Sequence, residues 1–122
     1  MTEYLEPADV EDLIALAGFH VRDRNLLLSA LAAPLPVYGE EVYPSVFDKA
    51  AALFIAINSD HPLSDGNKRL AWIVAKAFLA LNGHDLSAGS VADGDVFVRS
   101  AADHGFERIT IVEWIETHST RF

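Results

Sequence analysis

Residues 61–69 read His61-Pro62-Leu63-Ser64-Asp65-Gly66-Asn67-Lys68-Arg69. This stretch combines an imidazole, a carboxylate, a glycine, an amide and two cations. It follows one apolar run and opens another, so we expect a loop that leads into the first turn of a helix. The N–H groups at the start of a helix lack intrahelical partners and bind anions well, phosphates above all. The residue types predict a reactive centre, with a solvated polar loop between two helices as the alternative.

The composition predicts one soluble domain. The chain has 122 residues, 51% of them hydrophobic, and no cysteine. We expect a single domain over residues 1–122, with a hydrophobic core and without disulfides or thiolate chemistry. The acidic N-terminal stretch lacks the apolar region of a signal peptide. Because Lys49, Asn58 and Lys76 interrupt the longest apolar runs, we expect no membrane span and a cytoplasmic location.

The net charge of −9 argues against general nucleic-acid binding. Proteins that bind nucleic acid normally carry a basic face, whereas this chain has nine Lys and Arg residues against 18 Asp and Glu. Lys68 and Arg69 place two of those nine cations in the central stretch. This distribution favours a small anionic ligand or a basic partner, and an acidity that only aids solubility is the alternative.

Two strongly apolar helices are predicted on either side of the central stretch. One runs from Pro44-Ser45 to about residue 58, and the other covers residues 70–81 and stops at Asn82-Gly83. Their apolar side chains cover most of the helix circumference, which is typical of central, buried helices. We expect these two helices to form the core and to hold the loop between them.

Shorter helices are predicted around this pair, at residues 6–17, 23–33, 91–103 and 111–117. Asp23 and Thr110 are the expected caps of the second and the last of these. Residues 84–86 read as a turn and residues 119–122 as a fraying end. The sequence thus predicts an all-α fold, a compact bundle of about six helices with one short extended flap.

The flap is predicted between residues 34 and 44, where three prolines and a glycine exclude a helix. Val37-Tyr38 and Val42-Tyr43 flank Gly39-Glu40-Glu41, so the segment reads as a short extended hairpin. An exposed strand edge of this kind can pair with an incoming peptide, and an ordinary surface loop is the alternative.

His61 and Asp65 are the candidate reactive groups of the central stretch. Histidine readily takes up a proton near neutral pH, so His61 is the candidate general base. Because a proline follows it, we expect its backbone to be extended. Asp65 offers the hard oxygen that suits Mg²⁺, which commonly takes one or two carboxylates and completes its shell with phosphate oxygens.

The four residues Gly66, Asn67, Lys68 and Arg69 form the candidate phosphate cradle. A glycine lets a phosphate approach backbone N–H groups, and the asparagine amide can donate a hydrogen bond. Lysine and arginine supply positive charge, and arginine can bind phosphate through two nitrogens. A base, a metal ligand, an anion cradle and a charge clamp together predict phosphoryl or nucleotidyl transfer to a hydroxyl group.

The stretch HPLSDGNKR resembles the signature motif of the Fic/Doc superfamily, and it looks most like the Doc (death-on-curing) branch. Residues 22–34, 43–44, 49–53 and 78–83 also look like Doc-type segments at Doc-type spacing. The resemblance spans roughly residues 4–118. It implies a compact helical fold with His61 deprotonating the target hydroxyl and Asp65 holding Mg²⁺. It also implies that the phosphates of ATP are bound by Gly66, Asn67, Lys68 and Arg69.

The chain departs from the broad family pattern at three positions. Leu63 stands where the motif usually has Phe, and we expect it to pack under the loop with less contact area. AMP-transferring Fic proteins usually have glycine at the position of Lys68 and arginine at that of Trp72. The Doc branch has this lysine and is understood to bind ATP in the reversed sense, with the γ-phosphate facing the target.

The resemblance therefore implies phosphorylation of a Ser or Thr in a protein target, which in this branch is translation elongation factor Tu. Translation would then be arrested. An AMP-transferase of the same fold is one alternative, and a catalytically weak binding module of a toxin–antitoxin complex is another.

The resemblance also assigns roles to the flap and to a partner. In Fic-type enzymes a short extended segment pairs with the target peptide, which here implies Tyr38, Gly39, Val42 and Tyr43. The self-inhibitory pattern S/T-x-x-x-E-G/N does not occur in the printed chain. Inhibition in trans by a Phd-like antitoxin, partly disordered until it binds, is therefore implied. We expect no direct nucleic-acid or membrane partner.

Overall fold

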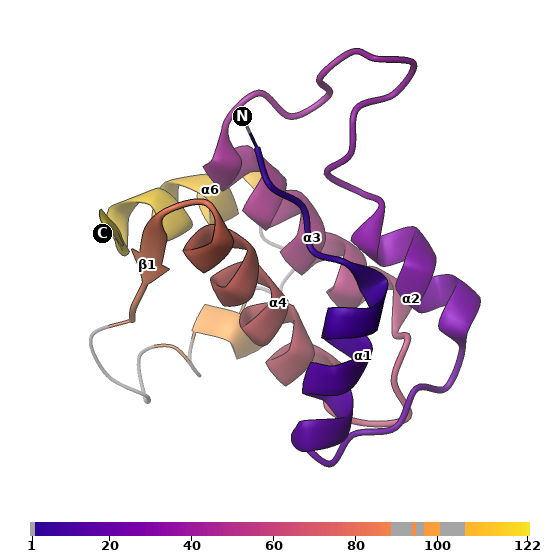
Figure 1. The fold of residues 1–122 in the computed structure, drawn as a ribbon. Helices are drawn as coiled ribbons and strands as arrows, with labels where there is room; N and C mark the ends of the chain where they lie inside the picture. The colour runs from indigo at the N-terminus through magenta and orange to yellow at the C-terminus, as the bar shows by residue number, and fades with distance from the viewer. Residues whose placement is uncertain (1, 89–93, 95–96, 101–106) are drawn as a thin grey trace.

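Helices dominate the computed structural model, which describes residues 2–88, 94, 97–100 and 107–122 (Figure 1). The elements with their bounds are α1 (Pro7–Leu16), α2 (Arg24–Leu31), α3 (Val46–Asp60), α4 (Asn67–Leu81), β1 (His84–Leu86), α6 (Arg108–Thr117) and β2 (Ser119–Arg121). The predicted all-α class is confirmed, with one small antiparallel sheet added, in which β1 pairs with β2. Among the described residues, no helix has both the length and the apolarity that crossing a membrane requires.

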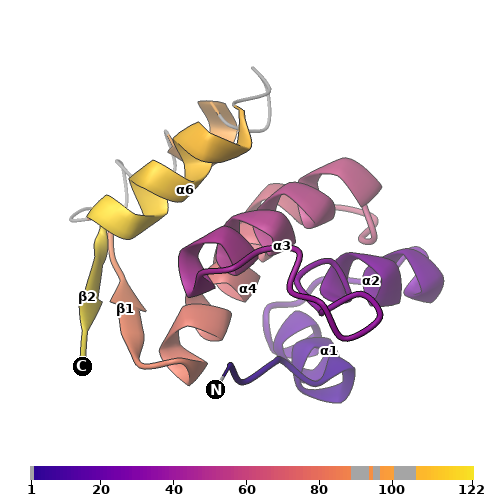
Figure 2. The same ribbon diagram turned by 90° about the horizontal axis from the view of Figure 1, so that it is seen from above.

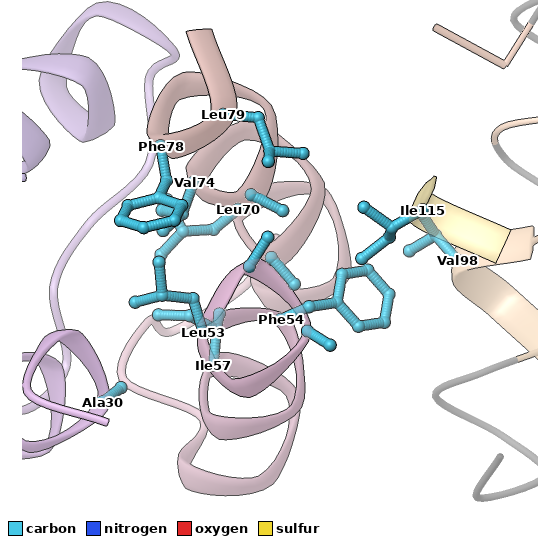
Figure 3. Close-up of a cluster of buried hydrophobic side chains, with 14 of the residues drawn as sticks. Ala30, Leu53, Phe54, Ile57, Leu70, Val74, Phe78, Leu79, Val98 and Ile115 are labelled. Atoms are coloured by element: carbon cyan, nitrogen blue, oxygen red, sulfur yellow. The ribbon is translucent and has the colours of Figure 1, made fainter. Parts of the chain in front are cut away.

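The helices α3 and α4 form the centre of the fold, as predicted. Apolar side chains of α3, including Leu53 and Ile57, meet those of α4, including Val74 and Phe78 (Figure 3). These side chains are almost fully buried, and burying each large apolar side chain contributes about 1.5–3 kcal/mol to stability. The two helices are therefore firmly packed, and the loop between them starts and ends at fixed positions.

The other helices cover this pair on two sides. Figure 2 shows α1 and α2 on one side and α6 on the other. Val10 and Ile14 of α1, Leu27 of α2, and Ile111 and Ile115 of α6 supply their buried faces. The N-terminal segment is fixed to the end of α4, since Asn82 exchanges two hydrogen bonds with the backbone of Glu3 at 2.8 and 2.9 Å.

Several predicted boundaries differ from the structure. The helix α4 begins at Asn67, three residues earlier than predicted, and therefore includes Lys68 and Arg69 in its first turn. The helix α6 begins at Arg108, so Thr110 lies inside it and does not cap it. Of the predicted helix 91–103, residues 94 and 97–100 are helical, and the rest lies outside the described residues.

The predicted turn at residues 84–86 and the predicted fraying end at 119–122 were wrong. The two segments pair as β1 and β2, with Asp85 opposite Thr120. One further backbone hydrogen bond extends the pairing at each end of the sheet. The N–H of Ser87 donates to the His118 carbonyl at 2.9 Å, and the N–H of Phe122 donates to the Gly83 carbonyl at 3.0 Å. Pairing satisfies backbone groups that a frayed end would leave to water.

Candidate active site

A cavity of about 940 Å³ lies at the N-terminal end of α4. Its lining includes every residue predicted to act as base, metal ligand or phosphate ligand: His61, Asp65, Gly66, Asn67, Lys68 and Arg69. Trp72 and Lys76 of α4 and the end of β1 complete much of its wall. The structure therefore brings the residues of the predicted reactive centre together around one space.

His61 ends α3 in the left-handed region, with φ 51° and ψ 57°, so the predicted extended backbone was wrong. A following proline disfavours the right-handed helical region but leaves this one accessible. The His61 N–H still bonds to the Ile57 carbonyl at 3.2 Å, which closes the last turn of α3. A residue with a side chain is strained at positive φ, so other contacts must hold it there.

The loop that follows His61 is paired with the segment that joins α1 to α2. Val21 and Leu63 form an antiparallel bridge, and the Ser64 N–H donates to the His20 carbonyl at 3.0 Å. Leu63 is 1% exposed and belongs to the core, so its expected packing under the loop is confirmed. The loop therefore rests on backbone pairing and a buried side chain.

Gly66 caps α4 with φ 90°, a conformation that side chains rarely allow. A Cβ atom at this position would lie 2.7–2.9 Å from three ring atoms of Phe19. Only glycine fits both the backbone angle and the space, so the aromatic ring can close directly over the start of α4. Gly66 has no side chain that could cap α4, and the start of a helix suits an anion at this end of the cavity.

The Asn67 side chain is occupied by the loop itself. Its Oδ1 accepts from the Leu63 N–H at 2.9 Å, and its Nδ2 donates to the Leu63 carbonyl at 3.1 Å. This two-way bond fixes the loop against the helix start. The amide of Asn67 thus shapes the loop, and its contact with phosphate stays a prediction.

Asp65 is exposed at the cavity, and its Oδ1 accepts from the Gly66 N–H at 2.9 Å. Within the described part of the chain, no group of three or more His, Cys, Asp or Glu side chains could hold a metal ion. A single oriented carboxylate fits Mg²⁺ in the form in which phosphate oxygens supply further ligands. Asp65 is thus suited to a metal ion that arrives with a nucleotide.

The cavity concentrates positive charge in an otherwise acidic chain. Lys68, Arg69, Lys76 and Arg99 line it, against the single lining carboxylate of Asp65 among the described residues. These are four of the nine Lys and Arg residues of the chain. A cleft lined by one sign of charge raises the local concentration of ligands of the opposite sign. The cavity is therefore suited to a polyanion.

Two of these cations, Lys76 and Arg99, were not predicted from the sequence as residues of the site. Lys76 follows Arg69 by seven positions, so helical periodicity could have placed both on one face of α4. Its Nζ donates to the Leu86 carbonyl at 2.5 Å and pairs with Asp85 Oδ1 at 3.3 Å, which attaches β1 to the cavity wall. The spacing between Arg99 and the motif gave no indication that Arg99 lines the cavity.

The flap contains a hairpin of a single residue pair. Val37 and Glu40 exchange backbone hydrogen bonds of 2.9 and 3.0 Å around Tyr38 and Gly39, which both have positive φ. The predicted pairing of residues 37–38 with 42–43 was wrong, because the two-residue turn at Tyr38-Gly39 closes the hairpin earlier. The Tyr38 side chain is fully exposed and Val42 is about half exposed. None of these flap residues lines the cavity.

Lys49 attaches the end of the flap to α3. Its side chain is 1% exposed, and its Nζ pairs with Glu41 Oε2 at 2.9 Å and donates to the Tyr43 carbonyl. Arg108 of α6 lies over the Tyr43 ring, 5.2 Å from the centroid, and pairs with Asp48 at 2.8 Å. The flap therefore has an exposed tip and a fixed C-terminal stem.

Replacing Lys49 with methionine should lower the free energy of unfolding by about 1–3 kcal/mol, because the Tyr43 carbonyl loses its charged donor. Urea unfolding followed by circular dichroism measures the change. Glu40→Gln is the matched control, and it should cost less than about 1 kcal/mol because the Glu40 side chain is exposed on the same flap. Equal losses in the two variants would contradict the assigned role of the buried lysine.

Comparison with known proteins shows the family of the chain. The sequence profile of the Fic/DOC family matches residues 4–79, which include the whole motif loop and most of α4. The chain belongs to the Fic/Doc family. A Fic/Doc protein from Mycolicibacterium smegmatis (strain ATCC 700084 / mc(2)155), named Toxin Doc, is 49% identical over 92 residues, which cover 72% of this chain and 71% of that protein. The predicted likeness to the Doc branch is thereby confirmed. No solved structure matches the chain.

Proposed function

We propose that this Fic/Doc protein is a Doc-like toxin of a type II toxin–antitoxin system and a protein kinase. It transfers the γ-phosphate of ATP to a Ser or Thr hydroxyl of a protein target. The name of the 49% identical relative supports the toxin assignment. We favour phosphoryl transfer over AMP transfer on one observation. Lys68 lies in the first turn of α4, at the cavity wall.

Lys68 bears on the reaction through its size and charge. AMP-transferring Fic proteins usually have a glycine there, which leaves room for the α- and β-phosphates against the helix start. An exposed lysine side chain takes up that room and adds a cation, and Trp72 replaces the arginine that such enzymes use further along the helix. This combination favours a reversed nucleotide, with its γ-phosphate at the motif loop.

The other residues of the candidate site have distinct proposed roles. His61 takes the proton from the attacking hydroxyl, and the N–H groups at the start of α4, with Lys68 and Arg69, bind and stabilise the phosphate charge. Asp65 would hold Mg²⁺. ATP supplies the phosphoryl group, and Mg²⁺ neutralises phosphate charge.

The proposed target is elongation factor Tu, and its phosphorylation would arrest translation. The exposed tip of the flap, with Tyr38 and Gly39, is suited to pairing with a target strand, while Val42 and Tyr43 connect the tip to the stem. A Phd-like antitoxin is the proposed inhibitor, and the cytoplasm is the proposed location.

Replacing Lys68 with glycine should lower transfer of the γ-phosphate by about 10²-fold, because one charge donor to the transferred group is lost. The assay incubates protein, Mg²⁺ and elongation factor Tu with ATP labelled at either the α- or the γ-phosphate. Lys68→Arg keeps the charge and should retain more γ-transfer than Lys68→Gly.

The same assay distinguishes the alternatives. Label transferred from the α-phosphate by the wild-type protein would support an AMP-transferase. Transfer from neither phosphate would support a binding module. Unchanged γ-transfer in Lys68→Gly would contradict the role given to Lys68.

A further inference from the structure

The Arg22 side chain binds the backbone of the candidate base. Its Nε and Nη2 donate to the His61 carbonyl oxygen at 3.2 and 2.7 Å, across 39 positions of sequence. We propose that Arg22 is a positioning residue that holds His61 in its reactive orientation. The inference rests on the proposed role of His61 as the base.

The conformation of His61 explains why such a contact is needed. At φ 51° the residue is strained, and strain of this kind persists only where neighbouring groups fix the backbone. Arg22 is the donor to the His61 carbonyl within the described part of the chain. A charged donor with two N–H groups on one oxygen restrains both the position and the rotation of that peptide group.

The backbone of the same segment holds the next carbonyl. The N–H groups of Arg22 and Asp23 donate to the Pro62 carbonyl at 2.7 and 3.2 Å. Two successive carbonyls of the motif loop are thus bound from one short segment between α1 and α2. The backbone bonds to Pro62 do not depend on the side chain at position 22. A substitution of Arg22 therefore tests only the side-chain bonds to His61.

Arg22 is absent from the lining of the cavity, whereas His61 and the cradle residues belong to that lining. Its guanidinium is bound to the backbone carbonyl oxygen of His61. Loss of the side chain should therefore disturb proton transfer and leave nucleotide binding intact. A direct phosphate ligand would show the opposite pattern.

The chain offers a matched control two positions away. Arg24 carries the same charge, and its Nε pairs with Glu11 at 2.7 Å. Arg24→Ala removes a cation and a surface contact without touching the motif loop. It separates the effect of the His61 contact from a general effect of charge.

The test measures the transfer kinetics of Arg22→Ala, Arg22→Lys and Arg24→Ala. We expect kcat of Arg22→Ala to fall by about 10- to 100-fold, since small misplacements of a reacting group have effects of this size. The KM for ATP should stay at the wild-type value. Arg22→Lys should recover part of kcat, because an ammonium group donates to one oxygen without the two-nitrogen fork. Arg24→Ala should match the wild type.

A second measurement does not depend on transfer activity. In NMR spectra, Arg22→Ala and Arg22→Lys should shift the His61 carbonyl and imidazole signals, and Arg24→Ala should leave them in place. A raised KM with unchanged kcat, or unmoved His61 signals in a folded Arg22 variant, would overturn the inference. Absence of transfer by the wild-type protein would overturn the proposed function instead, and the NMR result would still decide whether Arg22 holds His61.

Discussion

Replacing His61 with alanine is expected to lower the rate of phosphate transfer by about 10²- to 10⁴-fold, the usual contribution of a positioned general base. The hydroxyl of the target would then have to lose its proton to water. The variant should keep its fold, since the His61 side chain is exposed at the cavity. Label transfer from the γ-phosphate, at saturating ATP and target, measures the effect.

The control for this variant is His20→Ala. His20 is also exposed, and it contributes its backbone carbonyl to the loop, a contact that survives truncation of the side chain. We expect wild-type transfer from it. Full activity of His61→Ala would contradict the assignment of the base.

Replacing Gly66 with alanine is expected to lower the free energy of unfolding by about 2–5 kcal/mol, the sum of backbone strain at positive φ and of overpacking. The new Cβ would meet the Phe19 ring at 2.7–2.9 Å, so the ring or the start of α4 must move. Because the N–H groups of that turn belong to the proposed phosphate cradle, transfer activity should fall with stability. Urea unfolding and the labelled-ATP assay measure the two effects.

Gly18→Ala provides the matched comparison. Gly18 also has positive φ, 79°, yet a Cβ there would have no neighbour within 4 Å. Its loss should be limited to backbone strain, about 1–2 kcal/mol. Shortening the ring neighbour in Phe19→Leu/Gly66→Ala should recover part of the loss of Gly66→Ala. Equal losses at Gly18 and Gly66 would show that Phe19 does not constrain the cradle.

The central helices and the composition of the site could be predicted from the sequence. Apolar side chains around most of the circumference of α3 and α4 indicate buried helices in any fold, and all six predicted chemical residues of the loop line one cavity. Local rules were sufficient there, because the loop is short and both of its ends are fixed by the helices.

The remaining features depend on contacts between distant segments. The rule for a residue before proline excludes one backbone region, and the choice between the others at His61 is fixed by Arg22, 39 positions away. The three-residue strands β1 and β2 are each too short to be recognised from sequence. They are strands only because they pair with each other in the fold. The hairpin of the flap closes earlier than predicted because Tyr38 occupies a left-handed position that is unusual for tyrosine.

The size and charge of the cavity could not be predicted from the sequence, because they depend on segments that the fold brings together. Lys76 reaches the cavity from the second turn after Arg69, and Arg99 comes from a different helical segment. They add two cations to those of the motif, of which Lys76 is paired with Asp85 at 3.3 Å. The cations of the cavity suit a ligand with several negative charges, such as the triphosphate of ATP.

The most direct test of the proposed reaction is the mass of elongation factor Tu after incubation with the purified protein, ATP and Mg²⁺. We expect the intact mass to rise by one phosphate group on a Ser or Thr, and we expect no such rise with the His61→Ala protein. A gain of one AMP group, or an unchanged mass with the wild-type protein, would contradict the proposed reaction.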